Sequence, residues 1–271
     1  MIVFPNSKIN LGLHVTEKRP DGFHNIETVF YPVNWCDALE ILPHQGQAFE
    51  FSSSGFPISG KPETNLIYKA WLLLTQKRDL PAIRVHLHKH IPMGAGLGGG
   101  SSDAAWFLTH CNQHFQLNIP ELELLQMASS LGSDCAFFIK NEALLATGKG
   151  NEFSPIRLAL SGYYLLVVYP NVHSNTALAY QGLRPKKPEL TLRTILENHP
   201  IQDWQALLVN DFESSIFVKH PEIARLKQQL IGMGALYASM SGSGSAVYGL
   251  FEKAPDITSI KHFPHCLQNP A

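Results

Sequence analysis

Five glycines lie close together between Pro92 and Ser102, and they constrain the chain more than any other feature. An alternating pattern predicts a strand over 82–91 directly before them, and a helix is expected over 101–112 directly after them. Glycines at such a junction allow positive φ angles and a close approach of the backbone to a ligand. Because the N–H groups of a helix N-terminus bind anions, the segment predicts a phosphate-binding loop. Its two serines would cap the helix or contact phosphate oxygens and Mg²⁺, and Asp103 would add negative charge to the first turn.

Three known phosphate-binding schemes can be compared with this loop. A Walker A loop needs a lysine after its last glycine, and none follows Gly100. The string from Gly94 to Gly99 does fit the G-x-G-x-x-G pattern of dinucleotide-binding proteins, with Glu121 about 20 residues further on. However, Glu121 begins a predicted helix, whereas that pattern needs its acidic residue at the end of a second strand. The H-R-D and D-F-G triplets of protein kinases are missing, so of the three schemes the dinucleotide one alone stays open.

Length and composition limit the classes of protein to consider. At 271 residues the chain is long enough for two domains. The 21 basic and 22 acidic residues nearly balance, so no global field would recruit nucleic acid or an anionic membrane. Four scattered cysteines without a CxxC pair favour a reducing, cytoplasmic setting. Since no apolar run approaches the roughly 20 residues of a membrane helix, we expect a soluble protein.

Local patterns predict a mixture of strands and helices on both sides of the glycine loop. Short apolar runs separated by turn residues predict strands over 2–4, 11–15, 28–33, 38–42, 47–52 and 163–169, and a strand, loop, strand unit over 236–251. Helical spacing predicts helices over 65–77, 120–131, 203–218 and 221–231. The pattern changes beyond Gly150, which places the expected domain boundary between residues 155 and 156.

Thirteen histidines raise the question of a metal site. His86, His88 and His90 share one face of the strand over 82–91, and His110 and His114 stand one helical turn apart. Carboxylate partners at ligand spacing are missing, and a row of histidines on a solvent-facing strand explains the pattern equally well. The sequence therefore leaves any metal ligands unknown.

The glycine loop and two further segments resemble the three ordered motifs of the GHMP kinase superfamily. The loop matches the superfamily pattern P-x-G-x-G-L-G-S/G-S-S, and the other two motifs match Pro5 to Leu13 and Met240 to Ala246. Within the superfamily, three runs are similar to the family of 4-diphosphocytidyl-2-C-methyl-D-erythritol kinases. They are Lys8-Ile9-Asn10-Leu11, Arg19-Pro20-Asp21-Gly22-Phe23-His24 and Gly132-Ser133-Asp134. The resemblance covers nearly the whole chain.

The resemblance implies a fold and an activity. The fold is the α+β GHMP kinase fold, with an N-terminal α/β domain (1–155) that holds ATP and a C-terminal ferredoxin-like α+β domain (156–271). The active site lies in the cleft between them. The implied reaction transfers the γ-phosphate of ATP to the 2-hydroxyl of 4-diphosphocytidyl-2-C-methyl-D-erythritol, in the non-mevalonate pathway of isoprenoid biosynthesis. Another GHMP kinase, acting on mevalonate, homoserine or a sugar, is the nearest alternative, and an NAD-dependent oxidoreductase is a more distant one.

The resemblance also assigns the catalytic pair and the nucleotide-binding residues. Asp134 resembles the aspartate that accepts the hydroxyl proton, and Lys8 resembles the lysine that works with it. Asn10 lies on the same face of its strand as Lys8 and is expected to contact substrate. The residues implied in nucleotide binding are Asn65, Leu66, Pro92, Met93, Gly94, Ala95, Gly96, Leu97, Gly98, Gly99, Gly100, Ser101 and Ser102.

The family recognises cytosine through a histidine and two stacking rings. His24 matches the histidine, and Phe23 stands where the family commonly has tyrosine, so the ring face is kept while the hydroxyl is lost. Tyr180, four residues after Thr176, aligns with the opposite ring, and both are expected to contact substrate. The expected ligands are ATP, with Mg²⁺ travelling as its counterion, and a cytidine diphosphate conjugate of methylerythritol. No nucleic acid or membrane partner is expected, and the chain would be a monomer or weak homodimer.

Overall fold

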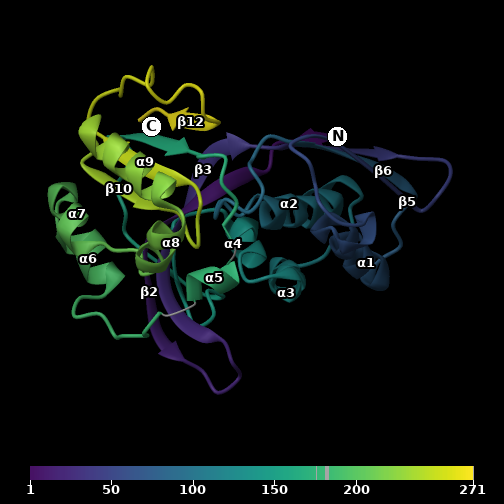
Figure 1. The fold of residues 1–271 in the computed structure, drawn as a ribbon. Helices are drawn as coiled ribbons and strands as arrows, with labels where there is room; N and C mark the ends of the chain where they lie inside the picture. The colour runs from purple at the N-terminus through teal and green to yellow at the C-terminus, as the bar shows by residue number, and fades with distance from the viewer. Residues whose placement is uncertain (175, 181–182, 271) are drawn as a thin grey trace. The chain divides into compact units, whose positions relative to one another are not determined.

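The computed structural model describes residues 1–174, 176–180 and 183–270, which divide into two compact units (Figure 1). The first unit contains residues 1–7, 35–93 and 98–142. The second contains residues 8–34, 94–97 and 143–271. Each unit is thus assembled from segments that are distant in the sequence, and the glycine loop passes from the first unit into the second and back.

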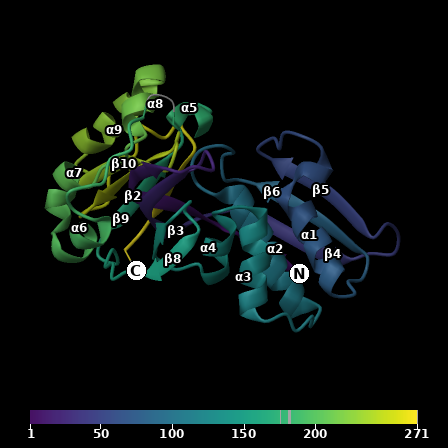
Figure 2. The ribbon, with the colours of Figure 1, turned by 90° about the horizontal axis from the view of Figure 1, so that it is seen from below.

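The first unit is a small sheet covered by helices (Figure 2). Its strand order is β1-β4-β6-β5, and β5 and β6 alone run parallel. The strands are β1 (Ile2–Val3), β4 (Ala38–Pro43), β5 (Phe49–Gly55) and β6 (Ile83–Lys89). The helices are η1 (Pro62–Thr64), α1 (Leu66–Lys77), α2 (Gly99–His114), α3 (Glu121–Leu131) and α4 (Cys135–Lys140). The helices over 65–77 and 120–131 are confirmed to within one residue.

Strand β6 shows the predicted alternation of buried and exposed side chains. Ile83, Val85, Leu87 and Lys89 are buried, whereas Arg84 and His88 are exposed. The burial of Lys89 follows from its position in this alternation, and the cation therefore has to be neutralised inside the unit. The imidazoles of His86 and His88, considered above as metal ligands, each hydrogen-bond to the hydroxyl of Ser54 at 2.9 Å.

Two sheets build the second unit. One has the order β2-β3-β7-β8, from β2 (Asn6–Lys18), β3 (His24–Cys36), β7 (Leu144–Thr147) and β8 (Glu152–Pro155). The other has the order β10-β11-β9-β12, from β9 (Tyr164–Val168), β10 (Tyr237–Met240), β11 (Val247–Phe251) and β12 (His265–Gln268). All pairings in the second sheet are antiparallel. Apolar side chains of β2, β9, β10 and β11 share one core with helices α8 (Glu213–Lys219) and α9 (Pro221–Gly232).

The remaining helices of this unit are α5 (Thr176–Tyr180), α6 (Leu192–Asn198), η2 (Ile201–Asp203) and α7 (Trp204–Leu207). The prediction of one helix over 203–218 was wrong, because the chain leaves the helix at Leu208 and resumes it at Glu213. The intervening residues pair with strand β2. Leu13 donates its N–H to Val209 and accepts one from Asp211, both at 2.9 Å. None of the helices in the described residues is long and apolar enough to cross a membrane.

Candidate active site

The middle of the glycine loop is fixed by the loop between β10 and β11. Ser241 donates its hydroxyl to the carbonyl of Gly96 at 2.9 Å, and Ala246 donates its N–H to the carbonyl of Ala95 at 3.0 Å. Gly96 has a φ of +77°, and a Cβ at this position would lie 2.0 Å from the carbonyl oxygen of Ser241. The glycine loop and the loop that carries the third motif therefore meet inside the second unit, where only glycine at position 96 allows so close an approach.

The end of the glycine loop forms the start of helix α2 in the first unit. The helix begins at Gly99, two residues earlier than predicted, and its N-cap is Gly98 in the left-handed region. The predicted capping by Ser101 or Ser102 is wrong, because both lie inside the helix and the N-cap has no side-chain bond. The helix thus presents small residues at its N-terminus, where backbone N–H groups are available to an anion.

A buried charge cluster lies beneath this helix. Lys89 donates to the carboxylates of Asp37 and Asp103, the second at 2.9 Å, and all three side chains are at most 3% exposed. Asp37 also accepts the backbone N–H groups of His90 at 2.6 Å and Ile91 at 2.8 Å. Asp103 is therefore a partner of the β6 lysine and not, as predicted, a charge in the first turn of the helix.

Two carboxylates sharing one ammonium group leave an excess negative charge in this cluster. Burial, opposed by the charge of Lys89 and reinforced by Asp37, raises the pKa of Asp103 to about 7. Burial alone would lower the pKa of Lys89, but the neighbouring carboxylates of Asp103 and Asp37 raise it. The ammonium group thus stays charged and links the end of β6 to helix α2. The position of Lys89 in the alternation of β6 explains its burial, but no local signal in the sequence identified its partners.

Lys8 and Asn10 lie together on β2, as strand alternation predicted. Lys8 is 4% exposed, and its ammonium group donates to the amide oxygen of Asn10 at 2.6 Å. The same ammonium lies 4.8 Å from the centre of the Phe30 ring. The amide nitrogen of Asn10 in turn donates to the hydroxyl of Thr28 at 2.9 Å, which donates to the carbonyl of Gly12 at 2.6 Å. This chain of hydrogen bonds fixes the orientation of the cation.

The residues expected to recognise cytosine all lie in the second unit. The rings of His24 and Tyr180 stack at 4.6 Å with an angle of 18° between their planes, and Tyr180 packs edge-on against Phe212. Phe23 is 58% exposed, and the ammonium group of Lys149 lies 4.3 Å from its ring centre. The structure thus brings His24 and Tyr180 into contact and leaves the Phe23 ring open to a ligand, with a cation beside it.

Thr176 and the residues before it contact the loop between β10 and β11. The hydroxyls of Thr176 and Ser243 lie 2.9 Å apart, and Ser174 donates to the carbonyl of Ser243 at 2.8 Å. The hydroxyl of Ser245 donates to the carbonyl of Val172. The start of helix α5 is thereby held against the third sequence motif.

Two further residues of the second unit, which were not predicted from the sequence, hold the third and the first motif. The side-chain amide of Asn210 donates to the carbonyls of Met240 and Gly242, each at 2.8 Å. Tyr248 donates its buried hydroxyl to the carbonyl of Asn10 at 2.7 Å. Asn210 lies inside the segment predicted as a helix. It can reach the third motif only because the chain leaves the helix there.

In the first unit, Asp134 and Asn65 both precede helices. Asp134 is half-buried and directly precedes α4, whose residues 135–138 are buried. Asn65 is the N-cap of α1 and accepts the N–H of Ile67 at 2.8 Å, and Leu66 is the first helical residue. Glu121 is the first residue of α3, so it does not end a strand as a dinucleotide-binding acid would. Among the described residues no group of three or more histidine, cysteine or acidic side chains could hold a metal ion.

Comparison with known families decides between the remaining alternatives. Residues 65–142 match the model of the GHMP kinases N-terminal domain, and residues 192–263 match the model of the GHMP kinases C-terminal domain. The chain belongs to the GHMP kinase family. The resemblance drawn from the three motifs is confirmed, and the dinucleotide-binding interpretation of the glycine string is wrong.

Relatives within the family cover nearly the whole chain. A protein of Bacteroides thetaiotaomicron, named 4-diphosphocytidyl-2-C-methyl-D-erythritol kinase, is 54% identical over 93% of this chain and 92% of its own length. A protein of the same name from Porphyromonas gingivalis is 48% identical over 95% of this chain and 94% of its own.

Solved structures agree with these relatives. The crystal structure of a 4-(cytidine 5'-diphospho)-2C-methyl-D-erythritol kinase superposes with a TM-score of 0.78 and 31% identity, covering 92% of this chain and 90% of that one. A mevalonate kinase of Methanococcus jannaschii, 15% identical, shares the fold with a TM-score of 0.70, covering 93% of this chain and 90% of that one. The expected α+β GHMP kinase fold is confirmed, and the chain is an ATP-dependent small-molecule kinase.

Proposed function

We propose that this GHMP kinase transfers the γ-phosphate of ATP to the 2-hydroxyl of 4-diphosphocytidyl-2-C-methyl-D-erythritol. The observation that carries the proposal is the similarity at 54% identity, over 93% of this chain, to a relative named for that substrate. The contact between His24 and Tyr180, which the motifs assign to cytosine recognition, supports it from the geometry of the second unit.

The proposed chemistry is a single in-line transfer. The substrate hydroxyl oxygen attacks the γ-phosphorus, the bond to the β–γ bridging oxygen breaks, and ADP leaves. The Asp134 carboxylate takes the hydroxyl proton, a role that rests on the Gly132-Ser133-Asp134 motif. Lys8 is proposed as the electrostatic partner in this step. Its ammonium group is held in place by Asn10 and by the ring of Phe30, as an oriented catalytic charge requires.

Substrate recognition is proposed for His24, Phe23, Tyr180, Thr176 and Asn10. Tyr180 is proposed as the ring opposite Phe23 that stacks on cytosine, and it also stacks on the imidazole of His24, whose ring nitrogens would hydrogen-bond to the base edge. The exposed ring of Phe23 offers one face for stacking, since the ammonium group of Lys149 lies over the ring and pairs with Asp21 at 3.1 Å.

ATP binding is proposed for the glycine loop, Pro92 to Ser102, and for the adenine-lining pair Asn65 and Leu66. The N-terminus of α2 would take the phosphates. Mg²⁺ would arrive with ATP and neutralise phosphate charge. Of the two loop serines, the half-buried Ser101 is the better candidate ligand of Mg²⁺, because the hydroxyl of Ser102 is completely buried.

Three broader expectations accompany this function. The boundary between N- and C-terminal domains is proposed at residues 155 and 156, which lies between the two matched family segments. A cytoplasmic location is supported by the four free cysteines. We further propose that the enzyme acts as a monomer or weak homodimer, without nucleic acid or membrane partners.

An ADP-release assay tests the proposal. Turnover is expected with the cytidylyl substrate and not with mevalonate or homoserine offered at the same concentration. Asp134→Ala should lower turnover roughly 100- to 1,000-fold, whereas the exposed control Asp79→Ala should leave it unchanged. Preferred turnover of mevalonate or homoserine would refute the assigned substrate. Near-normal turnover by a folded Asp134→Ala variant would refute the assigned base.

A further inference from the structure

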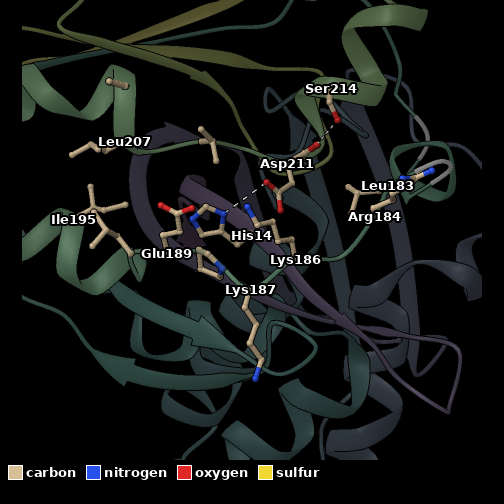
Figure 3. Close-up of a pocket in the computed structure, with 14 residues that line it drawn as sticks. His14, Leu183, Arg184, Lys186, Lys187, Glu189, Ile195, Leu207, Asp211 and Ser214 are labelled. Atoms are coloured by element: carbon tan, nitrogen blue, oxygen red, sulfur yellow. Dashed lines mark hydrogen bonds and ion pairs between the residues drawn. The ribbon is translucent and has the colours of Figure 1, made fainter.

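The second unit contains a large cavity that the proposed reaction does not use (Figure 3). Its volume is about 630 Å³, within the range of small-molecule sites. It is bounded by the segment 183–190, by helices α6 and α7, and by His14 of strand β2. None of the residues that the motifs assign to ATP or substrate lines it. The apolar part of its wall is formed by Leu183, Pro188, Leu190, Ile195, Ala206, Leu207 and Val209.

His14 is the buried polar group of this cavity. It is 6% exposed, and its Nε2 atom has no hydrogen-bond partner in the described part of the chain. Its Nδ1 atom lies 3.7 Å from a carboxylate oxygen of Asp211, whose other oxygen accepts the N–H of Val15 at 2.8 Å. An unpartnered buried nitrogen is costly, and a molecule bound in the cavity would lower that cost by supplying the missing partner. An Nε2–H group of this imidazole would donate to an anion in the cavity.

The rim of the cavity is basic. Arg184, Lys186 and Lys187 are exposed and line it, and their side chains form no ion pair with a described residue. The acidic side chains that also line it are Asp211, which faces His14, and Glu189. The rim segment is attached to the sheet, since Lys186 donates its N–H to the carbonyl of Val15 at 3.0 Å. Three cations and an oriented histidine, against two carboxylates, give the cavity an excess of positive charge.

We propose that this cavity binds a small organic phosphate with an apolar portion. The phosphate would accept from Nε2 of His14 and from the ammonium groups of Lys186 and Lys187, as charge-assisted hydrogen bonds. The apolar portion would lie against the leucine and isoleucine side chains of the wall. Because these residues are separate from those assigned to ATP, the two ligands should bind independently. The proposal does not depend on which hydroxyl the enzyme phosphorylates.

Calorimetric titration of the full chain with hexyl phosphate and with inorganic phosphate tests this site. Hexyl phosphate should bind saturably and more tightly than inorganic phosphate, with saturating ATP leaving its affinity unchanged. The variant Lys186→Ser/Lys187→Ser should bind hexyl phosphate at least about tenfold more weakly. The matched control Lys253→Ser/Lys261→Ser removes two exposed charges elsewhere and should bind normally.

A second measurement needs no variant. In the wild-type chain, the imidazole NMR signals of His14 should shift on titration with hexyl phosphate and saturate at the calorimetric midpoint. Absence of saturable binding, displacement of hexyl phosphate by ATP, equal weakening in both double variants, or unchanged His14 signals would each overturn the proposal.

Discussion

Replacing Lys89 by methionine would leave two carboxylates facing each other in the core of the first unit. The substitution keeps the length of the side chain but removes the charge that both Asp37 and Asp103 share. Asp37 would keep its two backbone N–H donors, whereas Asp103 would lose its cation, and its other carboxylate oxygen is already buried without a partner. Removing one partner of a buried ion pair typically costs about 3–5 kcal/mol of the free energy of unfolding. That is a large part of the roughly 5–15 kcal/mol that stabilises an ordinary domain.

The decrease in the free energy of unfolding caused by Lys89→Met should also depend on pH. Without Lys89, burial and repulsion by Asp37 would raise the pKa of Asp103 in the folded state further above the unfolded value of about 3.9. A group whose folded pKa is raised contributes stability at low pH and loses it as pH rises toward that pKa. In the wild-type chain this loss ends near pH 7, the pKa of Asp103. In the variant it continues above pH 7, so the deficit should be larger at pH 8.5 than at pH 6.

Urea unfolding followed by circular dichroism at pH 6 and pH 8.5 measures both effects. Lys77→Met is the matched control. Its ion pair with Glu123, at 3.2 Å, has side chains that are 52% and 26% exposed, and the control should change stability by less than about 1 kcal/mol. Lys89→Met/Asp103→Asn should be more stable than Lys89→Met, because it removes the repulsion. A Lys89→Met variant as stable as the control, or a double variant no more stable than the single one, would refute the reasoning.

Four further predictions follow from the site. The melting temperature of the wild-type chain should fall between about pH 4 and pH 7, because Asp103 ionises at lower pH in the unfolded state than in the folded state. Asp103→Asn should flatten this pH dependence. Gly96→Ala should lower stability by more than the roughly 1–2 kcal/mol of left-handed strain, because its Cβ would clash with Ser241. Gly232→Ala has open space and should be neutral or stabilising in thermal melts. Asn210→Leu should cost about 2–4 kcal/mol in urea unfolding, since it leaves two carbonyls of the third motif without their donor. Phe23→Ala should raise the substrate KM without changing the melting temperature, because its ring is 58% exposed, and an unchanged KM would contradict the stacking role.

Local patterns alone were sufficient for the elements that carry the loop. The alternation over 82–91 and the helical spacing over 65–77 correspond to β6 and α1, because each pattern reports one buried face of a single element. The glycines before α2 indicated a phosphate loop because their backbone freedom is a property of the residues themselves. The order of three motifs then indicated the family, since each motif is a short contiguous run.

Tertiary structure decided which of these residues contact one another. The helix predicted over 203–218 is broken because Leu13 on a distant strand offers the chain at 209–211 an alternative set of backbone hydrogen bonds. Asp103 pairs with Lys89 instead of serving the helix terminus, because in the low-dielectric interior a buried cation needs nearby anions.

The glycine loop depends on both the local sequence and the tertiary structure. Its sequence determined that the backbone could approach a ligand, and the fold added that Gly96 also lies against Ser241, from the far end of the chain. Composition and periodicity describe one element at a time, so they report burial and flexibility. A contact such as that between His24 and Tyr180 depends on the packing of several elements, which no local pattern contains.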